Sequence, residues 1–477
     1  MTEYKCTGFW YLPDNEERQV AGTLYISIKG DLRLSLIGTL SSEEEGETKS
    51  HRIVLGSVDK SPEGHAVTLT GCYKTEQHVG SHFESQEDYR ASRGYFGVHL
   101  KEETDFLFRK FLLKISGLTE WASRISGLHR ERYQIPTIKN QGEKITIATY
   151  LVPTPLSTMI PGASITLNMG IASKSGLHEI TFREEANFFI KLDEPLSSEK
   201  IDREYVYPLQ NLMTFVSDTA QELESFSVWQ SDDSDWNNNP VIRVVGPRVQ
   251  PDADLERKTP RRDQMLFTLE DILEPISFAT FIEKWLRLAN FHSKSFAIYF
   301  GMHYGPPAYI DMKYTLLSQA LVLYYERSEA GIEHRKEEEQ HLKDILIVVE
   351  EKHTDWLIEH LGVKPHPTFR NVLRRVMNKC GEAIDPIISK RRDAFINQAA
   401  NTLQYIERRA PEDQLAASQG PEFYWLMQKL LFLIKACYLN ELGFSSNNIA
   451  DLYNRNESFQ HLKKLESYLE LERDHSS

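Results

Sequence analysis

The chain has 477 residues, of which 40% are hydrophobic and 26% charged, so it is long enough for two or three globular domains and too apolar to be disordered. Its formal net charge of −14 argues against a general nucleic-acid coat protein, because phosphate binding needs clustered Lys and Arg. The acidic total leaves room for a local basic site. The four cysteines are scattered without a CxxC pair, which indicates neither a zinc site nor a disulfide framework.

No targeting or membrane segment is predicted. The N-terminus is polar and lacks the apolar core of a signal peptide. The most apolar run, Phe423–Leu442, is interrupted by Gln428, Lys429 and Lys435, which predicts a core helix rather than a membrane span. We therefore expect a cytoplasmic protein.

The first half is predicted to be rich in β-strands. The apolar runs Val20–Ile28 and Leu32–Leu40 flank Lys29-Gly30-Asp31, which is the pattern of a β-hairpin. Many short strands separated by polar loops favour an antiparallel sandwich or barrel-like domain. The further predicted strands are Arg52–Val58, Ala66–Tyr73, Tyr95–Leu100, Phe111–Ile115, Lys144–Val152, Ser164–Met169 and Glu179–Leu192.

The hydrophobic period changes to that of helices in the second half. A first helix is predicted near Glu204–Ala220, and a charged segment with two prolines follows at residues 251–263. After it, one helical face carries Phe278, Phe281, Ile282, Trp285, Leu288 and Ala289. Amphipathic stretches then follow at Tyr314–Ala330, His334–His360, Phe369–Lys379, Pro386–Arg408 and Glu422–Leu442. Helices with short connections indicate a bundle.

These patterns predict an α+β protein with three segments. A β-rich domain is expected over residues 1–250, a linker over 251–264 and an α-helical domain over 265–477.

One predicted helix carries an unusual polar edge. Asp385-Pro386 has the pattern of an N-cap with proline in the first turn, so the helix is expected to run from there through Arg408. At 100° per residue one narrow stripe holds Lys390, Asp393, Asn397, Asn401 and Gln404, opposite an apolar face. The stripe must meet water, another protomer or a ligand, and a plain solvated face is the ordinary explanation.

A basic patch is predicted on the preceding helix. Its members are Arg370, Arg374, Arg375 and Lys379. Such a patch can hold an RNA backbone, and salt bridges to the Glu-rich helix are an equally good explanation. His334, Glu338 and His341 do not have HExxH spacing, and no metal site or other cofactor is expected.

Two segments resemble known families. Gly8–Leu40, with its aromatic pair, Leu-Pro turn and Gly-Thr-Leu entry into the hairpin, resembles the N-terminal domain of the ApeA proteins. Leu317–Glu326, Ile387–Asn397 and the closing Leu439–Gly443 resemble the ApeA-like HEPN domain. The resemblance implies abortive defence against phage and a metal-independent endoribonuclease whose site forms between two protomers.

The HEPN signature is an Arg, a polar residue, spacers and a His, and its best match is Arg392 to Asn397. The resemblance implies that Arg392 binds phosphate, Asp393 orients it and Asn397 fills the histidine position. Cleavage by the ribose 2′-hydroxyl needs a base, an acid and positive charge. Asn397 cannot titrate, whereas Lys390 and Arg391 can supply charge. The resemblance also makes Glu326 a candidate acidic residue that supports the site from an earlier helix, and an exposed helix-end glutamate is the simpler explanation.

Three interpretations remain open at this point. The first is a phage-triggered endoribonuclease that forms a homodimer through the HEPN domain and cleaves host or phage RNA, with tRNA as a target by analogy. The second is a HEPN protein that has lost catalysis and binds RNA or dimerises. In the third, asparagine was introduced at position 397 to silence a toxic enzyme. The sequence alone does not separate the three, and the discriminating position is 397: RNA cleavage created by Asn397→His would indicate a degenerate member of the family.

Overall fold

The computed structural model describes residues 4–40, 50–61, 64–78, 86–123, 128–134, 144–150, 153–175, 180–233, 240–246, 261–306, 308–350, 353, 367–388, 390–408 and 417–475. The chain divides into two compact units. One comprises Met1–Met213 and Ala220–Thr259, and the other comprises Thr214–Thr219 and Pro260–Ser477. Most of the predicted linker, residues 251–260, lies outside the described residues.

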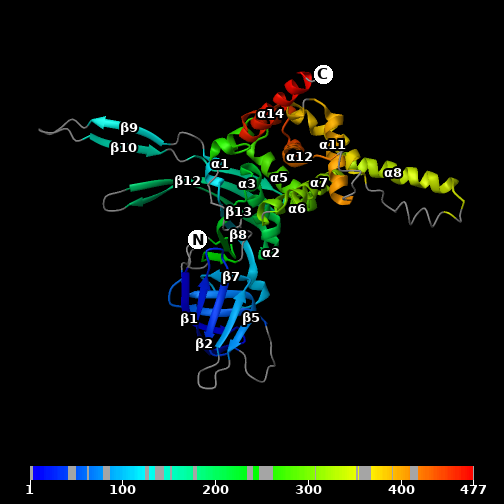
Figure 1. The fold of residues 1–477 in the computed structure, drawn as a ribbon. Coiled ribbons are helices and arrows are strands. Elements are labelled where there is room, and N and C mark those ends of the chain that lie inside the picture. Colours follow the sequence, from blue (N-terminus) through cyan, green and yellow to red (C-terminus); the bar gives the residue numbers. More distant parts are fainter. Residues whose placement is uncertain are drawn as a thin grey trace. The chain divides into compact units, whose positions relative to one another are not determined.

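The first unit begins with a closed antiparallel barrel of six strands, coloured blue in Figure 1. The ring closes because β6 pairs with both β3 and β5, in the order β5-β4-β1-β2-β3-β6. These strands are β1 (Tyr4–Leu12), β2 (Asn15–Ile26), β3 (Leu32–Ile37), β4 (Ser50–Val58), β5 (Ala66–His78) and β6 (Gln86–Ala91). Closure leaves the ring without a free edge.

Alternation of apolar and polar residues produces the barrel wall. In β3 the side chains of Leu32, Leu34 and Leu36 are buried, whereas Arg33 and Ile37 point outward and are exposed. The predicted hairpin is confirmed, because Ile26 pairs with Leu32 and Gly30 takes a φ of 84° in the turn.

The sheet continues from the barrel through further antiparallel strands. These are β7 (Arg93–Phe96), β8 (Leu107–Ile115), β11 (Leu156–Ile160), β12 (Ala163–Ser175), β13 (Ile180–Ser197), β14 (Leu223–Trp229) and β15 (Ile242–Val245). A separate ribbon pairs β9 (Leu128–Gln134) with β10 (Lys144–Tyr150). The helical pieces of this unit are α1 (Leu118–Ala122), α2 (Ser198–Ile201), the one-turn η3 (Asp202–Val206) and most of α3 (Tyr207–Ser217).

The second unit is built from helices throughout the residues that the structure describes. Its longer helices are α5 (Phe278–Phe291), α6 (Ser293–Tyr304), α7 (Ile310–Arg327), α8 (Glu329–Val348), α10 (Phe369–Cys380), α11 (Arg392–Arg408), α12 (Gly420–Leu442), α13 (Ser446–Arg455) and α14 (Glu457–His475). Figure 1 shows α8 extending away from the other helices. The predicted combination of an antiparallel β-rich region and a helical region is therefore confirmed.

Aromatic side chains fill the core of the helical unit. The face predicted for α5 is buried as expected, and Trp285 at its centre is fully enclosed. Phe215, from the last turn of α3, lies 5.6 Å from Trp285 and 6.1 Å from Tyr438, between ring centroids. These ring pairs hold Thr214–Thr219 to the helical unit.

Among the described residues, no helix has both the length and the apolar character needed to cross a bilayer.

Candidate functional site

The helix that carries the motif begins later than its sequence suggests. Residues Gly381–Ile387 form a 3₁₀ helix, and α11 starts only at Arg392. The prediction of a continuous helix from Pro386 is therefore wrong for its first turns. The carbonyl of Asp385 accepts backbone hydrogen bonds from Ile388 and Lys390, and Lys390 takes a left-handed φ of 56° that breaks the helical path. Lys390 consequently lies in the turn before α11, exposed, and is not part of the polar stripe.

Arg392 is held by a carboxylate. Its Nε donates to Asp385 Oδ1 at 2.8 Å, and its Nη2 donates to Asp385 Oδ2 at 2.6 Å. Its Nη1 reaches the carbonyl of Met377 at 3.4 Å. The hydrogen bond to Asp385 raises the pKa of Arg392. The phosphate-binding role of Arg392 stays a prediction, because a ligand there must compete with Asp385.

We expect Arg392→Ala to lower the free energy of unfolding by about 1–2 kcal/mol, since it removes a bidentate, half-buried pair and leaves the Asp385 carboxylate partly desolvated. Urea denaturation of the full chain measures this change. Arg391→Ala, one residue earlier and exposed, is the matched control and is expected to stay within about 0.5 kcal/mol of the wild type. Equal losses for the two variants would contradict the structural role of Arg392.

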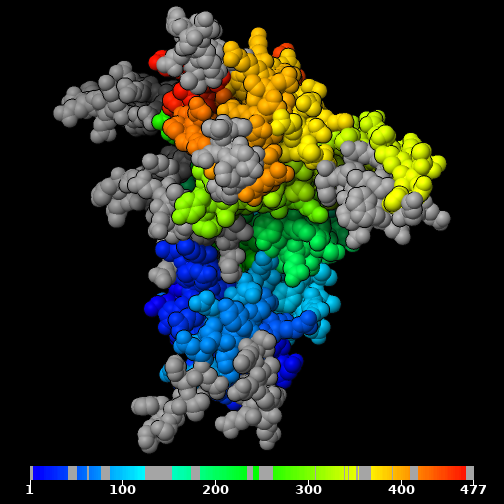
Figure 2. Space-filling model, turned by 45° about the vertical axis from the view of Figure 1, so that its right-hand side comes forward, coloured from blue at the N-terminus to red at the C-terminus, as the bar shows by residue number. Residues whose placement is uncertain are grey.

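The stripe of α11 is bound by an arginine from α10. Arg370 donates from Nη1 to Asn397 Oδ1, and from Nη2 to Asn401 Oδ1 at 2.8 Å. Asn397 and Asn401 are four residues apart, so their side chains lie one turn above the other on the same helical face. The structure thus joins the predicted motif position to one member of the predicted basic patch. Figure 2 shows the yellow and orange residues of α10 and α11 adjoining on the surface.

The other members of the basic patch have partners outside the stripe or are exposed to solvent. Arg375 donates from Nη2 to His334 Nδ1 at 3.0 Å, and Lys379 pairs with Glu441 at 2.9 Å. Arg374 is exposed. Asp393 is exposed as well, in the first turn of α11. Of the candidate cations, Arg370 is the one whose hydrogen bonds reach the stripe in the part of the chain that the structure describes.

A cavity of about 790 Å³ opens beside the stripe, between α7, α10 and α11. Arg370 and Phe369 line it from α10, and Gln404 and Arg408 line it from α11. Gln319, with apolar neighbours, closes it from α7. The walls therefore combine an aromatic ring, amides, two arginines and the carboxylate of Glu407, and the ring and the arginines are groups that can contact a base and its phosphate.

Sequence reasoning missed most of this cavity. Phe369, Gln319 and Arg408 were not singled out, because each is unremarkable on its own helix and only packing brings them together. The available signal was the polar stripe itself, because its last member, Gln404, lines the cavity. Glu326, the acidic residue predicted to support the site from an earlier helix, lines a different cavity near the end of α7.

Two models of known protein families match the chain, one in each half. The ApeA N-terminal domain 1 model matches residues 5–285, which is more than half of the chain. The Apea-like HEPN model matches residues 317–448, and this range holds all the candidate residues described above. Neither the curated proteins nor the solved structures contain a match to the chain. By its larger match and by the order of its two domains, the chain belongs to the ApeA family, with an ApeA N-terminal domain followed by an Apea-like HEPN domain.

Proposed function

We propose that this is an antiphage defence protein whose HEPN domain binds RNA along the α10–α11 face, with Arg370 meeting the phosphate backbone. The observation that supports the proposal is the bridge from Arg370 to the amide oxygens of Asn397 and Asn401. This bridge includes Asn397, the predicted position of the motif histidine.

The chemistry of the bridge favours phosphate binding. Two neutral amides orient the Arg370 guanidinium without balancing its charge, and the described residues provide it no carboxylate partner. Arg392 differs, because the carboxylate of Asp385 balances its charge. A planar guanidinium has five N–H donors, so Arg370 retains donors for the oxygens of a phosphate. The neighbouring cavity offers Phe369 for base stacking.

Position 397 limits the chemistry. A histidine there would transfer protons near neutral pH, and general acid–base catalysis of this kind contributes roughly 10²–10⁴-fold. Asn397 can only donate and accept hydrogen bonds. The proposal is therefore a HEPN protein that binds RNA and cleaves it slowly or not at all.

A metal-independent endoribonuclease is the second candidate. The feature that favours it is the exposed pair Arg391 and Asp393 at the start of α11, which offers a cation and a carboxylate one turn before Asn397. In this case paired HEPN halves cleave RNA, with tRNA as one target. Absence of cleavage of total RNA by the wild type, together with full defence by Arg392→Ala, would remove this candidate. The homodimer and a phage-derived trigger stay predictions.

RNA binding can be measured by fluorescence anisotropy with a labelled single-stranded RNA and the full chain. We expect Arg370→Gln to weaken RNA binding at least about tenfold. The loss of one phosphate contact should also reduce the slope of log K against log salt concentration by about one. Arg287→Gln is the matched control, because it makes the same charge change at an exposed site on α5. If both variants bind as tightly as the wild type, or both are weakened equally, the α10–α11 face is not the RNA site.

A further inference from the structure

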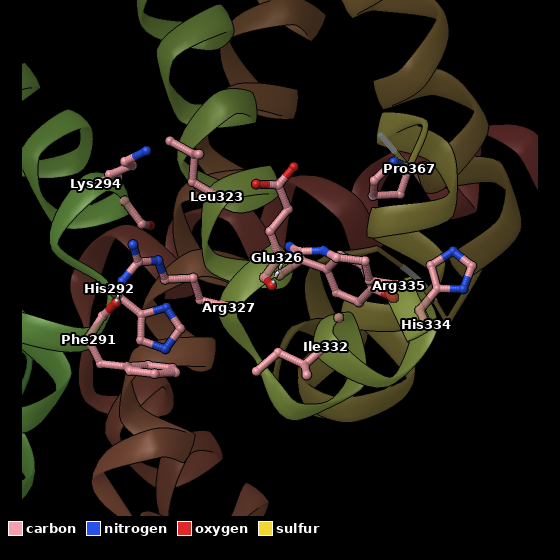
Figure 3. A pocket seen from close by; sticks show the side chains of 13 residues that line it. Phe291, His292, Lys294, Leu323, Glu326, Arg327, Ile332, His334, Arg335 and Pro367 are labelled. Atoms are coloured by element: carbon pink, nitrogen blue, oxygen red, sulfur yellow. Dashed lines mark hydrogen bonds between the residues drawn. The ribbon is translucent and has the colours of Figure 1, made fainter. Parts of the chain in front are cut away.

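A second cavity, of about 540 Å³, lies at the junction of four helices in the HEPN unit. The end of α5, the start of α6, the end of α7 and the first turns of α8 meet there. Figure 3 shows Glu326 near the middle, with Arg327 and His292 on one side and Arg335 and His334 on the other. A volume of this size is in the range of sites for small organic ligands.

The charge of its lining is positive. Lys294, Arg327 and Arg335 contribute three cations, and Glu326 is the single carboxylate among the lining residues. Arg327 donates to the carbonyl of Phe291 at 2.8 Å, and Arg335 donates to the carbonyl of Glu326 at 3.1 Å. Both partners are neutral carbonyl oxygens, so the guanidinium charges remain available in a chain whose net charge is −14.

The start of α6 adds polar groups directed to an anion. His292 is the residue before the 12-residue helix α6 and makes no side-chain cap hydrogen bond. The N-terminus of a helix attracts anions through its dipole and its first N–H groups. Lys294 and Ser295 line the cavity from the first turn of this helix.

His292 provides an independent observation. Its side chain is only 3% exposed and lines the cavity, and its Nδ1 has no hydrogen-bond partner among the described residues. The ring stacks on Tyr324 with centroids 4.8 Å apart. Burial lowers the pKa of His292 to about 4, so the imidazole is neutral at pH 7 and can accept or donate one hydrogen bond. A buried polar nitrogen without a partner is costly unless a ligand or water satisfies it.

An exposed aromatic ring in the lining favours a nucleotide over an anion without a base. Phe291 lines the cavity and is 47% exposed, and Ile332 beside it is 39% exposed. Exposed aromatic rings stack bases without sequence preference. These two side chains therefore provide an apolar surface next to the cations.

From this arrangement we infer that the cavity binds the phosphate group of a nucleotide, with Lys294, Arg327 and Arg335 around the phosphate and Phe291 against the base. The phosphate can come from a free nucleotide or from an RNA strand, and the chemistry of recognition is the same. Leu323 lines both this cavity and the one beside the α10–α11 face. None of the residues assigned here to the phosphate or the base lines that other cavity, so the inference does not depend on the α10–α11 face.

Isothermal titration of the full chain with adenosine 5′-monophosphate, with adenosine, and with a ten-nucleotide single-stranded RNA tests the inference. We expect the monophosphate or the RNA to bind and adenosine to bind at least about tenfold more weakly than the monophosphate. The double variant Lys294→Gln, Arg335→Gln changes two exposed side chains. It should lower the affinity for whichever probe binds the wild type at least about tenfold. Arg287→Gln is the control for charge and should leave binding unchanged.

The outcomes separate this site from the RNA site. Binding of the monophosphate that is lost in the double variant assigns a free nucleotide, and loss of RNA binding alone assigns an RNA phosphate. Either result stands even if Arg370→Gln leaves RNA binding intact, which would overturn only the proposed function. If neither probe depends on Lys294 and Arg335, or if neither binds the wild type, the inference is wrong.

Discussion

Asn397→His is expected to raise the rate of RNA cleavage by at least about 100-fold over the wild type, because it places a titratable group at the predicted position of the motif histidine. The introduced imidazole would lie beside the Arg370 guanidinium, which now donates to Asn397 Oδ1. A neighbouring cation disfavours the protonated form, so the imidazole would be available as a base at neutral pH. Arg370 would supply the positive charge that stabilises the developing phosphorane.

The measurement is the rate of cleavage of a defined RNA in the presence of EDTA, followed on denaturing gels. Asn401→His is the matched control, since Asn401 contacts the same guanidinium one turn further along α11 but is not at the motif position. We expect this control to cleave no faster than the wild type. A variant Asn397→His that binds RNA normally and cleaves at the wild-type rate would exclude a latent active site on this face.

Trp285→Ala is expected to cost about 3–5 kcal/mol of unfolding free energy in the helical unit, the range for a large aromatic side chain removed from a packed core. The ring is fully buried and lies 5.4 Å from Phe296 and 5.6 Å from Phe215, between centroids. Its loss leaves a cavity between α5, α6 and the end of α3, which the surrounding rings cannot fill without leaving their rotamers.

Guanidinium denaturation followed by circular dichroism at 222 nm reports mainly on this unit, because its described elements are helical. Tyr309→Ala is the control, since that ring is 89% exposed and its removal should change stability by no more than about 0.5 kcal/mol. A chain with two compact units can unfold in two steps, so the helical transition must be fitted separately. A shift of less than about 1 kcal/mol for Trp285→Ala would contradict the packing described here.

Several elements of the fold could be predicted from local patterns. The hairpin between β2 and β3 follows from two apolar runs around a glycine turn, and the buried face of α5 follows from its 3.6-residue period. The strands β1 and β6 were missed, because β1 is interrupted by polar residues and β6 (QEDYRA) carries three charges. Both are strands because the ring needs them to close, which is a property of the whole barrel.

The candidate site was predicted in part. The polar stripe, apart from Lys390, and the basic patch that contains Arg370 follow from helical spacing, whereas the motif position follows from the family resemblance and stays a prediction. The start of α11 was predicted wrongly, because Asp385 has the pattern of an N-cap but its carboxylate binds Arg392, seven residues later. Local capping preference is worth about 1 kcal/mol, and a bidentate ion pair can outweigh it.

By itself the sequence determined the family and the division into β-rich and helical parts, since each depends on residue identity or on short-range periodicity. Tertiary structure alone decided which arginine meets the stripe. Arg370 and Asn397 are on different helices, and only the packing of α10 against α11 turns Arg370 toward the amides while Asp385 holds Arg392. Side-chain contacts between helices depend on how the helices pack, and no spacing along one helix encodes them.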